Sequence, residues 1–226
     1  MIEVVWVLLL LVQTVCGSEE TLREYLIVNQ NRKVRPTQSN NQSVNIVLGL
    51  RLYQLIDVND KEESLKISAW ITMKWKDERM SWNVSEYDAE INYESNEVWK
   101  PDIVLFNSVG DEASSNIHMN QLHTDVVFNH NGEASWASPM VFTTRCRIDV
   151  EQFPFDEQHC YLKFASWTHS VKRMNVSGEE IDTRYYNSNQ EWNLAGVETI
   201  RKEVEYPPAT YAQVEFHIVL ERRTRF

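Results

Sequence analysis

Aromatic side chains are the residues of this sequence that could most readily do chemistry. The 226 residues include eight Trp, nine Tyr and eight Phe, which is many for this length, so they must form either a core or a site. Tyr206 and Tyr211 lie among polar residues and prolines, where a core role is less natural. The faces of such rings attract organic cations, by about 2 kcal/mol or more where water is excluded. The sequence therefore contains the materials of an amine-binding site.

The net charge of the chain is compatible with a cationic amine as ligand but does not require one. The formal net charge is −11, and an acidic surface raises the local concentration of cations. The same charge would also simply keep a secreted protein soluble. A nucleic-acid binder usually carries a basic stripe, whereas the basic residues cluster here only at Arg222, Arg223 and Arg225.

Motifs of catalysis and of metal binding are missing from the sequence. We find no Gly-x-Ser-x-Gly, no phosphate loop and no His-Glu-x-x-His, and the six histidines show no metal-ligand spacing. The paired Glu179 and Glu180 lie in a polar stretch and are interpreted as solvated. We therefore expect no enzyme, no metal site and no cofactor.

Residues 1–17 indicate export. An apolar run followed by small residues is typical of a signal peptide cleaved before Ser18, although Glu3 stands where a basic residue is usual. The run is too short to span a bilayer comfortably, and no later segment has 18 consecutive apolar residues. We expect an extracellular domain over residues 18–226, secreted or displayed at the cell surface.

The cysteines and sequons support that expectation. Cleavage removes Cys16 and leaves Cys146 and Cys160, which suggests one disulfide in an oxidising compartment. Three Asn-x-Ser sequons predict glycosylation, at Asn41, Asn83 and Asn175.

The periodicity of the chain predicts an all-β fold after one short helix. Ser18 to Asn29 has a capping residue, early acidic residues and one apolar face. Residues 46–52 alternate, and in residues 65–75 the apolar positions from Leu65 to Trp75 share one face, with an acidic turn at 57–63 between the two strands. Further strands are predicted at residues 102–106, 124–128, 133–137, 141–150, 159–166 and 213–222. Many short strands without a dividing linker favour a single β-sandwich domain.

Cys146 and Cys160 enclose thirteen residues with an unusual tip. Phe153 and Phe155 flank Pro154 and precede Asp156 in an otherwise polar loop, which suggests a buried or partner-facing contact. Immunoglobulin domains bridge strands much further apart in sequence, so that fold is disfavoured.

This loop resembles the signature loop of the pentameric Cys-loop receptors. Other segments are similar to the same family in the same order: Lys33–Pro36, Trp82–Tyr87, Trp99–Asn107, Leu162–Trp167 and Glu191–Gly196. The resemblance is strongest to nicotinic acetylcholine receptor subunits and to the soluble acetylcholine-binding proteins. It implies a ten-stranded β-sandwich with an N-terminal helix, a pentamer of identical or homologous subunits, and a cis bond before Pro154.

The resemblance also implies an aromatic box for a small cationic neurotransmitter at the subunit interface. On the principal face, Trp167 matches the central tryptophan, Tyr206 and Tyr211 match the capping-loop tyrosines, and Phe106 replaces a usual tyrosine. On the complementary face, the matching residues are Trp75, Val127, Ser135 and Ala137, with Glu180 and Asp182 in a nearby acidic loop. Trp70, Trp82, Trp99 and Trp192 are interpreted as structural.

Several alternatives stay open. The capping loop, Tyr206 to Tyr211, lacks the adjacent cysteines of nicotinic α subunits, so the chain is non-α-like in this loop and could be an accessory subunit with only a complementary face. In receptors the tip formed by Phe153, Pro154, Phe155 and Asp156 contacts the membrane domain, which favours a receptor ectodomain over a soluble binding protein. Acetylcholine is the expected ligand, with choline or a betaine-like amine as alternatives. A structural or adhesive glycoprotein is a third class, which the retained aromatic residues disfavour.

Overall fold

The computed structural model describes residues 18–28, 30–39, 41–85, 87, 89–109 and 124–224. The predicted signal peptide and Cys16 lie outside this part. The described chain consists of one helix and ten strands: α1 (Glu19–Val28), β1 (Val44–Asn59), β2 (Ser64–Ser81), β3 (Glu90–Tyr93), β4 (Ile103–Leu105), β5 (Val126–Asn129), β6 (Asn131–Arg145), β7 (Glu157–Ser166), β8 (Met174–Gly178), β9 (Trp192–Tyr206) and β10 (Ala209–Arg222). The expected all-β sandwich with a short N-terminal helix is confirmed. Within these residues, no helix has the length and apolar character needed to cross a membrane.

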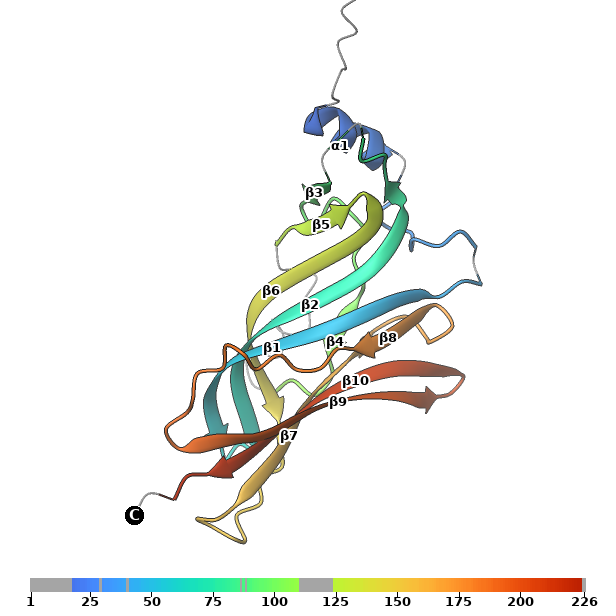
Figure 1. Cartoon of the computed structure of the whole chain (residues 1–226). Coiled ribbons are helices and arrows are strands. Elements are labelled where there is room, and N and C mark those ends of the chain that lie inside the picture. The colour runs from blue at the N-terminus through green and yellow to red at the C-terminus, as the bar shows by residue number, and fades with distance from the viewer. Residues whose placement is uncertain are drawn as a thin grey trace, which may run out of the picture.

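The strands form two sheets. The six-stranded sheet has the order β3-β5-β6-β2-β1-β8, and the four-stranded sheet has the order β4-β7-β10-β9. Figure 1 shows α1 at one end of an elongated molecule and the loop between β6 and β7 at the opposite end, beside the C-terminal end of β10. Buried side chains of both sheets belong to one hydrophobic core.

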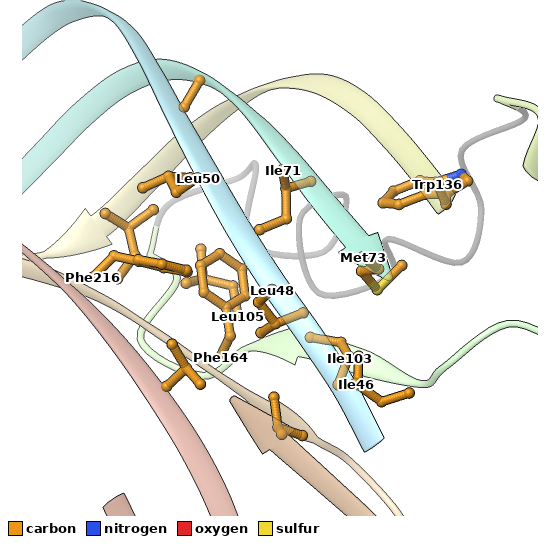
Figure 2. Close-up of a cluster of buried hydrophobic side chains, with 14 of the residues drawn as sticks. Ile46, Leu48, Leu50, Ile71, Met73, Ile103, Leu105, Trp136, Phe164 and Phe216 are labelled. Carbon is orange, nitrogen blue, oxygen red and sulfur yellow. The ribbon is translucent and has the colours of Figure 1, made fainter. Parts of the chain in front are cut away.

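Alternation along the strands builds that core. On β2 the odd-numbered positions from Leu65 to Trp75 are buried, and the even-numbered positions point away from the core. On β10, Val214, Phe216, Ile218 and Leu220 are buried in the same way. Figure 2 shows side chains of both sheets meeting, with Leu48 and Ile71 on one side and Phe164 and Phe216 on the other.

Some strand boundaries differ from the sequence prediction. β1 continues through Asn59, so the hairpin turn is shorter than residues 57–63. The two strands expected at 133–137 and 141–150 are one strand, β6, which ends at Arg145. β5 pairs with β6 only up to Trp136, so Pro139 lies where β6 has β2 as its only strand neighbour in the described chain. Proline is tolerated at such a position because no ladder bond is required there.

Cys146 and Cys160 form the expected disulfide, with Cα atoms 5.1 Å apart. Cys146 directly follows β6 and Cys160 lies in β7, so the bond connects the six-stranded sheet to the four-stranded sheet at one end of the molecule. The bond between Phe153 and Pro154 is cis, as the resemblance implies. Phe153 and Phe155 are both largely exposed at the tip.

Candidate functional site

Four aromatic residues expected on the principal face line one open hollow of about 380 Å³. Phe106, Trp167, Tyr206 and Tyr211 border it together with Gln213. The rings of Phe106 and Trp167 are 5.8 Å apart, and those of Tyr206 and Tyr211 are 6.0 Å apart and edge-on. Trp167 and Tyr206 are more than half exposed, so their faces remain open to a ligand.

The four-stranded sheet brings these residues together. Phe106 directly follows β4 and Trp167 directly follows β7, and β4 and β7 are antiparallel neighbours. Tyr206 ends β9 and Tyr211 lies near the start of β10, across a turn of only two residues, Pro207 and Pro208. The hollow therefore lies near the end of the sheet where β7 and β9 end and β10 begins, and Phe106 follows the other end of the short β4, where its amide donates to the Lys163 carbonyl of β7 at 2.8 Å.

A buried glutamine orients one tyrosine. Gln213 is almost fully buried under the hollow, and its Nε2 donates to the Tyr206 hydroxyl at 3.4 Å. The sequence analysis missed Gln213, although its position two residues after Tyr211 places it on the same face of β10.

Asp102 holds the loop that carries Trp167. Its carboxylate accepts hydrogen bonds from the Ser166 hydroxyl at 2.6 Å and from the Thr168 amide and hydroxyl at 2.8 and 2.5 Å. Its carbonyl accepts the Trp167 amide at 3.1 Å. Burial lowers the pKa of neighbouring His169, so its imidazole is neutral at pH 7.

Three of the four predicted complementary-face residues share one outer surface. Val127 on β5 pairs with Ser135 on β6, and Ala137 lies two residues further along the same face of β6. Across the next ladder, Ser135 and Ala137 pair with Lys74 and Thr72 of β2, which also point outward.

Trp75, the fourth residue predicted for this face, has its side chain on the core side of β2. It pairs with Ala134, whose side chain is buried, and it has the parity of the core residues of β2. It borders an outer hollow of about 450 Å³ that Val127 and Ser135 also line, but only 4% of the residue is exposed. Its ring packs edge-on against Trp99 at 6.0 Å. Trp75 is therefore a core residue.

Trp70 occupies the outer position instead. It is 39% exposed, pairs with Pro139 and lies 5.7 Å from the ring of Tyr53. The sequence analysis interpreted Trp70 as structural. Strand parity could have found it, because if Leu65 to Trp75 point inward at odd positions, an even-numbered Trp70 must point outward.

The predicted acidic loop lies against this outer face. Glu180 and Asp182 line a hollow of about 600 Å³ together with Trp70 and Thr72. Asp182 is held by Arg51 at 2.7 Å and by Arg184 at 2.8 Å. The pKa of the Asp182 carboxyl lies well below its usual range, mainly because it accepts hydrogen bonds from Arg184. The loop is thereby fixed on β1.

The end of the molecule that carries the Phe-Pro-Phe tip has an ion cluster that the sequence did not reveal. Arg222 bonds both carboxylate oxygens of Asp156, at 2.8 and 3.1 Å, and Glu191 at 2.8 Å. Its guanidinium lies 4.2 Å from the centre of the Trp192 ring and 5.1 Å from that of Phe153. Asp156 thus joins the tip to the end of β10.

Comparison with known proteins agrees with this architecture. Residues 19–224 match the family described as neurotransmitter-gated ion-channel ligand binding domain. The chain is 36% identical, over 97% of its length, to acetylcholine receptor subunit alpha-like 2 of Drosophila melanogaster, of which the match covers 40%. It is 36% identical to acetylcholine receptor subunit alpha-L1 of Schistocerca gregaria, over 91% of this chain and 39% of that protein. An alpha-type acetylcholine receptor subunit of Caenorhabditis elegans is 33% identical, over 96% of this chain and 46% of its own length.

The chain therefore spans less than half the length of these relatives. The relatives are receptor subunits and not enzymes. With the family match over nearly all of the described residues, the two-sheet fold and the disulfide between β6 and β7, the chain belongs to the neurotransmitter-gated ion-channel ligand-binding domains of the nicotinic acetylcholine receptor type.

Proposed function

We propose that this chain binds acetylcholine or a related cationic amine in an aromatic box between two subunits of an extracellular pentamer. The observation that carries the proposal is the open hollow lined by Phe106, Trp167, Tyr206 and Tyr211. A ring face stabilises a quaternary ammonium by about 2 kcal/mol or more once water is excluded. A neighbouring subunit would exclude that water.

The second half of the box would come from the neighbour. The outer face of the six-stranded sheet carries Trp70, Thr72, Ser135 and Ala137, whereas the principal aromatic residues lie near one end of the four-stranded sheet. The principal aromatic residues line one hollow, Trp70 and Thr72 line a second, and Ser135 lines a third. Two chains placed side by side could bring one set of each kind to a single ligand.

The residues of the hollow favour a cation without N–H groups. Its lining includes no carboxylate, and its polar side-chain groups are the hydroxyls of Ser166, Tyr206 and Tyr211, the indole N–H of Trp167 and the amide of Gln213. The Tyr206 hydroxyl already accepts a hydrogen bond from Gln213. The Ser166 hydroxyl already donates to Asp102 and accepts the His169 amide. Phe106 adds a ring face but no hydroxyl. A ligand that needs only ring faces suits this surface better than a primary amine with three donors to satisfy.

A second candidate is a subunit that contributes only its complementary face. The hairpin from Tyr206 to Tyr211 is short and contains no cysteine, so it covers the hollow less than a longer capping loop would. The exposed Phe153 and Phe155 support a receptor-type domain over a soluble binding protein, because an apolar tip fits a contact with a membrane domain.

A fluorescence titration tests the first proposal. The chain is purified, its mass in solution is measured, and tryptophan emission is followed while acetylcholine is added. We expect a pentamer with a saturable change that Trp167→Ala abolishes. Tyr25→Ala, at an exposed aromatic residue of α1, serves as the control and should leave the titration unchanged. A pentamer without any response would refute binding on this chain's own principal face and support the second candidate.

Asp102→Asn is expected to weaken acetylcholine binding about tenfold with little loss of folded protein. The amide keeps the size of the carboxylate but loses the charge that accepts three hydrogen bonds at the Trp167 loop. Hydrogen bonds to a charged group contribute roughly 1.5–3 kcal/mol, and 1.4 kcal/mol corresponds to a factor of ten. Isothermal titration gives the affinity and circular dichroism the fold. Unchanged affinity in a well-folded variant would show that the clamp does not position Trp167.

A further inference from the structure

The three predicted glycosylation sequons stand in different structural settings. Asn83 is exposed in the turn after β2, where its Oδ1 accepts the amide and hydroxyl of Ser85 at 3.1 and 2.9 Å. Asn41 is exposed in the segment that precedes β1. A sugar on either residue would extend from a turn at the surface, where it disturbs no strand pairing.

Asn175 lies in a strand and both atoms of its amide are in use. It is part of β8, where it pairs with Asn45 of β1. Its Nδ2 donates to the Asn45 Oδ1 at 3.1 Å, and its Oδ1 accepts from Arg201 of β9 at 2.7 Å. The sequon hydroxyl, on Ser177, donates to the Ile46 carbonyl at 3.3 Å.

Arg201 makes this arrangement hard to alter. Its guanidinium also pairs with Glu203 at 2.6 Å and donates to the Val176 carbonyl at 3.0 Å. A glycosylated amide is a planar secondary amide, and in its trans form the sugar carbon lies on the same side of the C–N bond as the oxygen. A sugar on Asn175 would therefore stand next to Oδ1, where Arg201 is bonded.

We infer that the secreted protein carries glycans on Asn41 and Asn83 and none on Asn175. Transfer of the sugar precedes folding, so transfer to Asn175 is not blocked in the extended chain. A molecule modified there would have to fold without the hydrogen bond from Arg201 to the Asn175 side chain, which joins β9 to β8. Such molecules are expected to stay in the cell, and the secreted population is expected to lack the third glycan.

Site-by-site mass spectrometry tests this inference. The full chain is expressed in cultured insect cells, and the secreted and retained fractions are separated. Glycans are released enzymatically in heavy-oxygen water, which converts each formerly glycosylated Asn into labelled Asp. In the secreted fraction we expect label at Asn41 and Asn83 and no label at Asn175. Label at Asn175 in most secreted molecules would overturn the inference, and so would the absence of label at Asn41 or Asn83.

Matched serine variants provide the controls, because each removes a sequon and leaves its asparagine in place. Ser43→Ala and Ser85→Ala should each reduce the secreted protein by one glycan, whereas Ser177→Ala should leave its glycan count unchanged. Ser177→Thr keeps the hydroxyl and the sequon, and it suits a strand. We expect it to be secreted without label at Asn175 as well. Secreted Ser177→Thr protein with a glycan on Asn175 would show that the strand accommodates the sugar, which contradicts the inference.

Discussion

Trp75→Ala is expected to lower the free energy of unfolding by about 3–5 kcal/mol, the usual cost of truncating a buried Trp. Only 4% of Trp75 is exposed, and its ring packs edge-on against the buried ring of Trp99. Trp70→Ala is expected to affect ligand binding and not stability, because Trp70 is 39% exposed on the outer face. It should leave unfolding almost unchanged and weaken acetylcholine binding by about 30-fold, since about 2 kcal/mol of cation–ring attraction is lost.

Urea unfolding and ligand titration of the two variants show which of the two tryptophans contacts the ligand and which one stabilises the core. Ser68→Thr, on the same outer face of β2 but outside the residues proposed to contact the ligand, is a control that should change neither measurement much. If Trp75→Ala folded normally and lost binding, whereas Trp70→Ala bound normally, the original prediction for Trp75 would be right and the outer-face assignment wrong.

Asp156→Ala is expected to lower the free energy of unfolding by about 3 kcal/mol, because it removes the buried partner of Arg222 and leaves only the exposed Glu191 and Asp60 beside the guanidinium. The side chains of Asp156 and Arg222 are 1% and 9% exposed, and two hydrogen bonds join them. Asp60 lies 3.8 Å from the same Arg222, but its side chain is 51% exposed. Asp60→Ala is therefore the matched control and should cost at most about 1 kcal/mol.

The same pair predicts a dependence of stability on pH. Burial alone would raise the pKa of Asp156, but the hydrogen bonds from Arg222 and Gln158 outweigh it, so the pKa lies below the ordinary value. A carboxyl group with a lowered folded-state pKa stabilises the fold above its unfolded pKa of about 4, and this contribution is lost as the pH falls through the folded-state pKa.

Urea unfolding at pH 7 and pH 3 measures this contribution. The wild-type chain should lose more stability between the two values than Asp156→Ala does. Equal losses in both chains would show that Asp156 is not a source of the acid sensitivity.

Strand parity accounts for much of what the sequence predicted well. The alternation from Leu65 to Trp75 gave the buried face of β2, and the apolar positions of β10 were found in the same way. β9 was missed by periodicity because its sequence barely alternates, and few of its residues are buried. Its edge position in the four-stranded sheet explains why it can remain so polar.

The sequence predicted those site residues that belong to a recognisable motif. It did not predict residues whose role depends on a contact with a side chain far away in the sequence. Phe106, Trp167, Tyr206 and Tyr211 were named from the sequence and lie together. The contact between Arg222 and Asp156 joins residues 66 positions apart, and neither has a local pattern that indicates the other. The prediction for Trp75 followed the motif, whereas the parity of the strand places this residue among the core side chains.

The parallel pairing of β1 with β8 has a consequence for how the chain folds during synthesis. Asn45 and Asn175 are neighbours across this pair although they are 130 residues apart in sequence. Contacts between such distant segments form slowly, because a long loop must close before any stabilising contact is made. While the ribosome makes the first 170 or so residues, the edge of β1 from Val44 to Leu48 has no β8 to pair with. An unpaired edge can take up a strand of another chain, so this interval is when aggregation is most to be expected and when a chaperone would help most.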